Sequence, residues 1–344
     1  MQIHAHPIAL ALETPFKIAH GTSLTRDNVI VTIDDGVGVA AITPYYPAQV
    51  PDVLDYVQQP ELQAVLQQDI RHVDHLISQL PPGPAPARAA VDMALHDLWA
   101  RTLDQPLYAL WGLNPATAPL SSYTLGMAES EEAFQDKVLA ARHYPILKIK
   151  LGTGSVDGDY RLVEIAARHT DARLCVDANA AWTVDDAARI IPELTRFNLL
   201  FVEQPLAQHD IEGWHALGAR LPAEHPPLIA DESIHDSRDI LPLHGAADGI
   251  NIKLAKCGGL REARKMIAHA RALNMVVMLG CMVESVVGVT AAAHLAPLVD
   301  FADLDGFLTV TNDPYTGGAQ WHNGKLILPD APGLGVTPRL QQQR

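Results

Sequence analysis

The spacing of apolar and polar positions at the start of the chain predicts strands. Apolar residues alternate with polar ones at about residues 2–12, 28–33 and 38–43, the pattern of strands with one buried face. Asp35-Gly36 lies between the second and third of these segments and favours a tight hairpin turn. We therefore expect the chain to begin with strands, at least two of which form a hairpin.

Helical spacing follows these strands. Apolar residues recur at helical intervals over about 51–79 and again in ARAAVDMALHDLWAR, and the run PPGPAP (81–86) separates the two stretches. In the second stretch the apolar face consists mostly of small side chains and is suited to close packing. Its residues are Ala90, Ala94, Leu98 and Ala100. The first part of the chain thus reads as an α+β unit.

From about residue 118 the pattern changes to short apolar strands that alternate with helical stretches of about 10–15 residues. The predicted strand ends lie 22 to 28 residues apart, near Lys150, Asp177, Glu203, Asp231, Lys253, Gly280 and Asp305. One strand, one helix and two short loops fit this interval. Seven or eight such units would close an α/β barrel.

Charged residues recur at the carboxyl ends of these predicted strands. Because side chains alternate between the faces of a strand, each charge lies opposite an apolar face that would pack on the outer helices. The charged set comprises Lys148, Lys150, Asp177, Glu203, Asp231, Lys253, Asp303 and Asp305. Burying unpaired charge costs several kcal/mol or more, so such a set is hard to explain by stability. It fits an active site, which barrels place at the carboxyl ends of their strands.

Three of these residues predict a metal site. Asp177, Glu203 and Asp231 end successive strands, and neighbouring strands lie about 4.8 Å apart. Carboxylates this close repel one another unless a cation joins them, and an all-oxygen set favours Mg²⁺, with Mn²⁺ as a substitute. The alternative is a network of salt bridges with the nearby lysines.

Two lysines predict acid–base chemistry. Lys150 and Lys253 end the second and sixth predicted barrel strands, so their ammonium groups would face each other across the pocket. Lysine has a reference pKa of about 10.4, which desolvation and neighbouring cations such as Lys148 and the metal can lower towards about 7–8. Two opposed groups of this kind suit a 1,1-proton transfer, in which one removes a proton and the other returns it to the opposite face.

Asp303 and Asp305 are not needed for that step. Two adjacent inward carboxylates require a cationic partner, and the ammonium group of a substrate would serve. Basic groups of the protein itself are the alternative partners.

Composition narrows the class of protein. The 344 residues carry a formal charge of −15, which argues against a general basic surface for nucleic acid or anionic membrane. The three cysteines are scattered and show no zinc or disulfide spacing, so we expect a reducing, cytoplasmic compartment. The start of the chain does not resemble a signal peptide, and the longest apolar run, near residues 275–283, is too short to span a bilayer.

The strand-end motifs resemble the enolase superfamily in its muconate-lactonizing-enzyme-like branch. The matching pieces are KIK (148–150), DANAAW (177–182), EQP (203–205), ADES (230–233) and KLAKCGG (253–259). The similarity spans almost the whole chain and includes PFKIAHG near the start. Lysine bases with Mg²⁺ are typical of this superfamily.

This resemblance implies a fold and a set of roles. The fold is a (β/α)7β barrel with an α+β capping domain, and we place the cap at 1–115, the barrel at 116–315 and a C-terminal segment that returns to the cap at 316–344. The cap loops near 16–26 and 43–50 would close over the substrate. The implied magnesium ligands are Asp177, Glu203 and Asp231, the acid/base pair is Lys150 and Lys253, and Lys148 contacts the substrate carboxylate.

The DLD sequence of residues 303–305 and the stretch MLGCMVES (278–285) are similar to dipeptide epimerases, in which the DxD pair holds the substrate ammonium. The implied reaction inverts the α-carbon of the C-terminal residue of a dipeptide through an enediolate held by the metal. Ser23 and Met282 are further expected substrate contacts, and a homo-oligomer is expected. Glutamate-selective members carry an arginine in the first mobile loop, whereas Arg26 lies too late in the sequence, so the preferred side chain stays open.

Other functions remain as alternatives. N-succinylamino acid racemases, o-succinylbenzoate synthases and muconate cycloisomerases share the metal and the lysines, but their substrates offer no ammonium for the DxD pair. Acid-sugar dehydratases usually place a His-Asp pair where this chain has Lys253. A barrel that only binds a metal or small ligand would need the carboxylates but not two opposed lysines.

Overall fold

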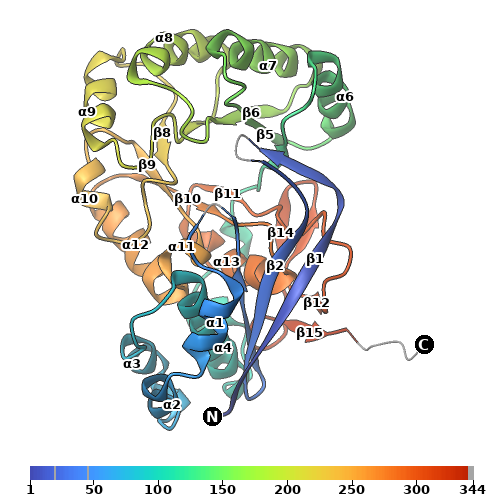
Figure 1. Ribbon diagram of the computed structural model, residues 1–344, viewed down its shortest axis with the longest axis vertical. Helices are drawn as coiled ribbons and strands as arrows, with labels where there is room; N and C mark the ends of the chain where they lie inside the picture. The colour runs from blue at the N-terminus through green and yellow to red at the C-terminus, as the bar shows by residue number, and fades with distance from the viewer. Residues whose placement is uncertain (19–20, 45, 340–344) are drawn as a thin grey trace.

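The computed structural model of the protein describes residues 1–18, 21–44 and 46–339, apart from the side chains of 14–18 and 21–23. Its N-terminal sheet is antiparallel, in the order β1 (Ile3–Ile18), β2 (Gly21–Ile33), β3 (Gly36–Ala41). The first two strands are longer than predicted because they resume pairing, in a shifted register, beyond Ala11. Most of the segment 16–26, expected to be a loop, is therefore strand, and the hairpin runs from the small helices up to the barrel (Figure 1).

The helical stretch predicted at 51–79 is wrong as a single helix. The chain forms four short pieces, namely α1 (Val50–Val57), α2 (Pro60–Val65), η1 (Ile70–His72) and α3 (Val73–Ser78). Pro60 has no N–H to continue α1, and it starts α2 instead. Asp69 then starts a new turn by accepting a hydrogen bond from the Arg71 N–H.

The second predicted helix is α4 (Ala85–Thr102), and its small residues do pack closely. A Cβ atom on Gly36 would overlap Ala94 O, and one on Gly38 would overlap Ala90 O, so only glycine lets β3 lie this near the helix. Ala90, Ala94 and Leu98 belong to the core of the N-terminal unit, whereas Met93 and Ala100 belong to the main core around the barrel. The helix therefore joins the two cores.

The described chain then forms a sheet of eight parallel strands, with α5 (Leu107–Leu110) and η2 (Pro115–Thr117) leading to it. The strands are β4 (Tyr123–Leu125), β5 (Ile146–Lys150), β6 (Arg173–Asp177), β7 (Val202–Glu203), β8 (Leu228–Ala230), β9 (Gly249–Ile252), β10 (Val276–Gly280) and β11 (Phe301–Asp303). Each pairs with the next, and a parallel bridge from Ser121 to Ala302 joins the first to the last. This closure confirms the predicted barrel and its strand ends.

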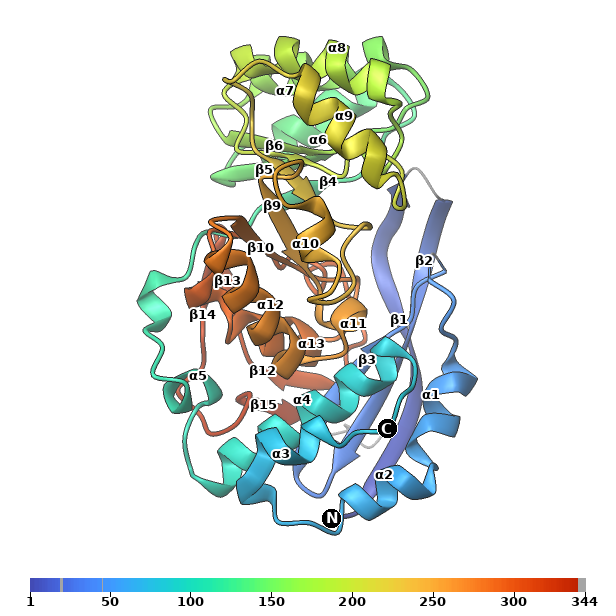
Figure 2. The same cartoon turned by 90° about the vertical axis from the view of Figure 1, so that its left-hand side faces the viewer.

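Helices connect successive barrel strands and surround them (Figure 2). They are α6 (Glu131–Ala141), α7 (Val156–His169), α8 (Val184–Leu194) with η3 (Thr195–Phe197), α9 (Ile211–Arg220), α10 (Ile240–Leu243), α11 (Leu254–Cys257) with α12 (Leu260–Ala272), and α13 (Val286–Ala293) with η4 (Ala296–Leu298). Seven strand–helix units followed by a last strand give the predicted (β/α)7β arrangement.

Inside the barrel, an apolar layer lies on the same strand faces as the charged residues. Cys175, Phe201 and Ile229 pack together there with Leu200 and Met278. The first three precede Asp177, Glu203 and Asp231 by two residues, the interval that returns a strand to the same face. The predicted alternation is thus confirmed, and the charged layer has an apolar floor.

After β11 the chain returns to the N-terminal part. Short strands follow, namely β12 (Tyr315–Gly317), β13 (Gln320–His322), β14 (Lys325–Ile327) and β15 (Val336–Pro338). Thr311 N donates to Ala11 O in β1, and Leu334 N donates to Asp97 of α4. No helix in the described ranges combines the length and apolarity needed to cross a bilayer.

Two buried aspartates of α4 fasten it to its neighbours. Asp92 accepts hydrogen bonds from Leu260 N and Arg261 N at the start of α12. Asp97 accepts from Val37 N, Leu334 N and Arg101 Nε. One helix thus links the N-terminal sheet, a barrel helix and the C-terminal segment.

His294 is buried where α13, α5 and the C-terminal segment meet. Its Nδ1 accepts a hydrogen bond from Tyr108 N at 3.1 Å, which leaves the proton on Nε2, 3.5 Å from Leu334 O. Burial lowers the pKa of His294 from 6.5 to about 4. Because the unfolded chain binds the proton more readily, this contribution to stability is full above about pH 6.5 and is lost as the pH falls towards 4.

We expect His294→Gln to weaken the pH dependence of stability. Between pH 7.5 and 5 the wild-type protein should lose about 2 kcal/mol more of its free energy of unfolding than the variant, because glutamine does not titrate. Urea unfolding of both proteins at the two pH values measures this difference, and all other titrating groups cancel in the comparison. Equal losses would show that His294 is not buried in its neutral form.

Candidate active site

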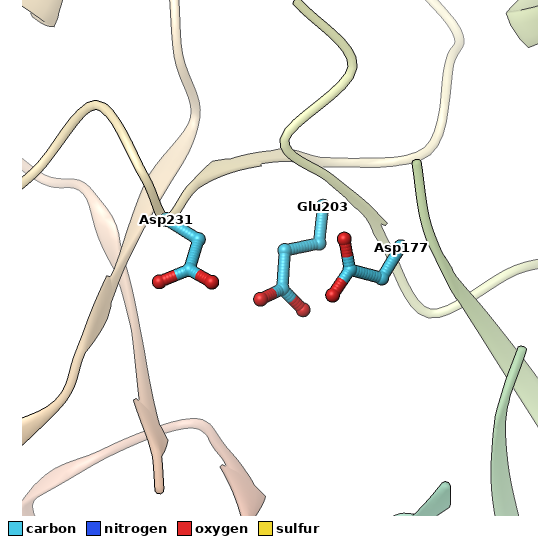
Figure 3. A group of neighbouring side chains, drawn as sticks. All are labelled: Asp177, Glu203 and Asp231. Carbon is cyan, nitrogen blue, oxygen red and sulfur yellow. The ribbon is translucent and has the colours of Figure 1, made fainter. Parts of the chain in front are cut away.

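Three carboxylates converge at the carboxyl ends of the central barrel strands. Asp177 and Glu203 end β6 and β7, and Asp231 directly follows β8. One oxygen of each lies within 4.8 Å of the others, and all three side chains are at most 1% exposed. Figure 3 shows the three groups pointing to a common point from separate segments of the chain. The predicted convergence is thus found in the structure.

Local turns hold these carboxylates in place. Asp177 Oδ1 accepts a hydrogen bond from Asn179 N at 2.9 Å. Gln204 adopts a φ of 37°, which turns the chain directly after Glu203. Its side-chain Oε1 accepts from Asp231 N at 2.8 Å, and its Nε2 donates to Ser233 Oγ at 2.8 Å. The EQP and ADES motifs therefore fix the spacing of two acidic side chains.

A second tie joins the loops that follow β5 and β6. Trp182 of the DANAAW motif is buried and donates from Nε1 to Asp159 Oδ2 at 2.8 Å. Asp159 Oδ1 accepts from Gly152 N and Thr153 N in the loop after Lys150. The glycine-rich stretch at 151–158 is thus a structural loop.

Lys148 lies at the centre of the charged layer with no exposed surface. Its Nζ is 2.6 Å from Glu203 Oε2, 2.7 Å from Asp303 Oδ2 and 3.4 Å from Asp177 Oδ2. Burial alone would lower the pKa of Lys148, but these carboxylates raise it well above its usual value. Lys148 is therefore a fixed positive charge.

Lys150 and Lys253 face each other from β5 and from the end of β9, four strands apart in a ring of eight. Lys150 Nζ lies 2.6 Å from Asp177 Oδ2, and Lys253 Nζ lies 2.6 Å from Asp231 Oδ2. Burial alone would lower the pKa of Lys253, but Asp231 and Glu203 raise it well above its usual value. For the pKa of Lys253 to fall towards about 7–8, as expected from the sequence, Asp231 would have to pair with another cation in its place.

The carboxylates fit a hard divalent cation. Glu203 Oε1 accepts from Asn251 Nδ2 at 2.8 Å, whereas its buried Oε2 has no hydrogen bond, its contact with Lys148 being an ion pair. Burial and the charge of Asp177 raise the pKa of Glu203 to about 8. Glu203, with Asp177 and Asp231 beside it, thus offers a group of buried oxygens to an ion that prefers oxygen ligands.

Lys256 is a further charged residue of this layer that was not predicted. Its Nζ donates to Asp231 Oδ1 and to the carbonyl oxygens of Asp231 and Asn251, and its side chain is almost fully buried. The spacing KLAK could have revealed it, because one short helical turn, α11, returns the residue after three positions to the strand end. Asp231 thus has two lysine partners.

Asp303 and Asp305 lie together at the end of β11, as expected, but their surroundings differ. Asp303 is 6% exposed and contacts Lys148, Ser122 and Thr124. Asp305 is partly exposed and lines the cavity above the charged layer. Its Oδ2 accepts a hydrogen bond from Thr124 N at 2.6 Å. Ser122 and Thr124 were not predicted; Thr124 belongs to β4, which closes the barrel beside β11, and Ser122 directly precedes that strand.

A cavity of about 1100 Å³ lies above the charged layer and includes Lys148, Lys150, Lys253, Asp303 and Asp305 in its wall. Met282 lines this cavity and a neighbouring one of about 600 Å³, and its contact with substrate stays a prediction. The side chain of Ser23 lies outside the described residues. Arg26, expected to lie too late in the sequence to be the arginine of the first mobile loop, is a buried residue of β2 in the cavity wall.

The chain is similar to several proteins that are named as epimerases of dipeptides. An L-Ala-D/L-Glu epimerase from Bacteroides thetaiotaomicron is 35% identical over 342 residues, which cover 98% of this chain and 88% of that protein. A hydrophobic dipeptide epimerase from Roseobacter litoralis is 40% identical over 260 residues, 74% of each protein. The solved dipeptide epimerase of Enterococcus faecalis V583 with Mg and L-Leu-L-Tyr has a TM-score of 0.87 and 30% identity, and the match covers 98% of this chain and 99% of that one.

Two family models match consecutive parts of the chain. The model described as mandelate racemase / muconate lactonizing enzyme, N-terminal domain, matches residues 3–112, and the one described as enolase C-terminal domain-like matches residues 130–342. The matched regions cover the N-terminal unit and, after β4, the rest of the barrel with the acidic and basic residues at its end. The chain therefore belongs to the mandelate racemase / muconate lactonizing enzyme family of the enolase superfamily.

Proposed function

We propose that this protein is a magnesium-dependent dipeptide epimerase, which inverts the α-carbon of the C-terminal residue of a dipeptide by 1,1-proton transfer. The observation that carries this proposal is the opposition of Lys150 and Lys253 across a buried acidic trio. A metal-binding protein without activity would need the trio but not the opposed lysines.

Asp177, Glu203 and Asp231 would hold the magnesium ion. The ion supplies positive charge beside the substrate carboxylate, where negative charge grows as the α-proton leaves. Lys148 would contact the same carboxylate from the centre of the barrel. Its full burial and its three carboxylate neighbours support a fixed charge in that position.

Lys150 and Lys253 would exchange the proton at the α-carbon, each from its own side. The barrel end holds more carboxylates than lysines: the carboxylates of residues 177, 203, 231, 232, 303 and 305 against the ammonium groups of 148, 150, 253 and 256. A divalent cation would offset this excess of negative charge and take over carboxylates that now pair with the lysines. One lysine would then be able to stand there uncharged and accept a proton.

A dipeptide is the substrate whose charges best match the carboxylates of Asp303 and Asp305, which the proton transfer itself does not need. Asp303 and Asp305 would take the free ammonium group, whereas an N-succinylamino acid would bring a further carboxylate against them. The relatives from Bacteroides thetaiotaomicron and Roseobacter litoralis are named as dipeptide epimerases, and the related solved structure holds Mg and a dipeptide. Domain limits at 115 and 315 and the homo-oligomer stay predictions.

A library of L-Ala-L-X dipeptides in D₂O with Mg²⁺ tests the substrate class. We expect a mass gain of one deuterium at the α-carbon of the C-terminal residue, read by mass spectrometry, and a mixture of epimers by chromatography. The library includes X = Glu, because Arg26 lines the cavity, and large apolar residues, because of the relative that acts on hydrophobic dipeptides. Labelling of N-succinylamino acids and of no dipeptide would contradict the proposal.

Substitution of the two lysines tests the two-sided transfer. Lys150→Ala and Lys253→Ala should each lower epimerisation by at least about 10³-fold, since each removes one of the two proton carriers. Each variant should still exchange the α-proton of one epimer, and the two variants should differ in which. Lys265→Ala removes an exposed lysine of α12 and is the matched control. Exchange of both epimers by either variant would show that one base suffices.

Mg²⁺ binding should depend on the acidic trio. We expect the wild-type protein to unfold at a higher temperature with excess Mg²⁺ than with EDTA, since an ion that binds only the folded state stabilises it. Asp177→Asn should abolish this shift, whereas Asp157→Asn, which removes one exposed carboxylate of α7, should keep it. Differential scanning calorimetry measures the shift, and a shift retained in Asp177→Asn would place the ion elsewhere.

A further inference from the structure

The cavity above the charged layer is not confined to the reacting groups. At about 1100 Å³ it offers more room than an alanyl dipeptide fills, since pockets of about 300–1,000 Å³ hold drug-sized ligands. One part of its wall comes from β4 and the loop after it, from α6 and the chain that follows it, and from the segment after β11. We call this part the seam groove. Its wall comprises Tyr123, Met127, Ala133, Ala140, Tyr144 and Leu308.

The seam groove lies where, in the described ranges, the barrel lacks a covering helix. Each strand from β4 to β10 is followed by a helix, whereas the segment after β11 runs to the N-terminal sheet, where Glu13 N donates to Thr309 O at 2.8 Å. Thr124 of β4 points inward to Asp303, so alternation along the strand places Tyr123 on the outer face. The groove therefore runs along the outside of the barrel, at the place of an eighth helix.

Helix α6 presents small side chains to the seam groove. Ala133, Lys137 and Ala140 line the cavity at intervals of four and three residues, which place them on one face of the helix. Lys137 Nζ donates to the carbonyl oxygens of Gly126 and Met127 at 3.0 and 2.9 Å and so holds the loop after β4 against the helix. The two alanines leave the space between this helix and the segment after β11 open.

Two aromatic rings form a further wall of the seam groove. The rings of Tyr123 and Tyr144 are stacked, with centroids 4.2 Å apart and planes inclined by 17°. Both side chains are partly exposed and pack on the main core. Aromatic rings gain from contact with another ring at their face or edge. The seam groove therefore matches a large apolar side chain, and an aromatic one best.

The inner end of the seam groove is at Asp305. The Asp305 carboxylate accepts a hydrogen bond from Thr124 N, directly beside Tyr123. Burial, and then the charges of Tyr144 and Asp305, raise the pKa of Tyr123, so its phenol and the Asp305 carboxylate lie close together. In the proposed function the substrate ammonium group lies at this carboxylate, and the carbon that carries it also carries the side chain of the N-terminal residue.

We infer that the seam groove binds the side chain of the substrate's N-terminal residue and makes the enzyme select dipeptides that begin with a large aromatic residue. The inference rests on the proposed function and adds a preferred substrate class to it. The side chain of the C-terminal residue starts elsewhere, at the α-carbon between Lys150 and Lys253, and does not enter the groove.

Dipeptides that differ only in the N-terminal residue test this selection. With Z the C-terminal residue best labelled in the L-Ala-L-X library, the substrates are L-Phe-L-Z, L-Ala-L-Z and L-Lys-L-Z, and the readout is kcat/KM for deuterium exchange. We expect the wild-type enzyme to favour L-Phe-L-Z over L-Ala-L-Z by about 10- to 100-fold, because a benzyl group buries far more apolar area than a methyl group. It should also favour L-Phe-L-Z over L-Lys-L-Z.

Filling the seam groove should remove the selection. Ala133→Leu should bring the ratio for L-Phe-L-Z over L-Ala-L-Z to within about threefold of one and keep the ranking of C-terminal residues in the L-Ala-L-X library. Ala140→Leu, at a more exposed position of α6, should act in the same direction and serves if Ala133→Leu does not fold, as judged by its thermal unfolding. The matched control is Ala188→Leu, at a partly buried position of α8 that lines neither of the two cavities, and it should keep the ratio.

The inference is overturned if the wild-type enzyme does not prefer L-Phe-L-Z over both other substrates, or if the folded groove variants keep the preference. It is also overturned if Ala188→Leu removes the preference as well, or if Ala133→Leu changes the ranking of C-terminal residues instead. In each of these cases exchange of dipeptides still occurs, so the proposed function stands. If the wild-type enzyme exchanges no dipeptide in the presence of Mg²⁺, the proposed function fails, and the inference fails with it.

Discussion

An almost fully buried ammonium group lies in the middle of the barrel end, and the arrangement around it follows from the need to neutralise it. Lys148 is held by carboxylates from three other strands. Asp177 also pairs with Lys150, and Asp231, the third member of the acidic trio, pairs with Lys253 and Lys256, because no carboxylate can be buried without positive charge nearby. The acidic trio thus joins two groups of ion pairs into one charged layer.

This network is possible because apolar structure encloses it. Below it the side chains of Cys175, Phe201, Ile229 and their neighbours fill the barrel and exclude water. Above it the N-terminal unit is held in position by α4, whose aspartates bond to a barrel helix and to the C-terminal segment. In such an enclosed site the attraction between charges is stronger than in water, which suits a reaction that moves a proton from carbon.

Residue spacing predicted the parts that depend on local pattern. Alternation along strands put Asp177, Glu203 and Asp231 on one face, and the interval between strands put them at one end of a barrel. Contacts between distant segments were not predictable in this way. Lys256 reaches Asp231 through a short helical turn, and Ser122 reaches Asp303 across strands that are 181 residues apart in sequence. The helix at 51–79 was wrong because the periodicity of apolar residues continued through Pro60, which ends one helix and starts another.

Closure of the barrel, where the first strand meets the last, matters both for folding and for the binding site. The first and last strands meet through the bridge from Ser121 to Ala302, and the same two strands supply Thr124 and the paired aspartates. Before these ends meet, Asp303 and Asp305 have neither their donors nor their fixed separation from the opposite strands. The proposed recognition of a ligand's amino end would thus be a property of the completed ring, and a chain that has formed only some of its strand–helix units would lack it.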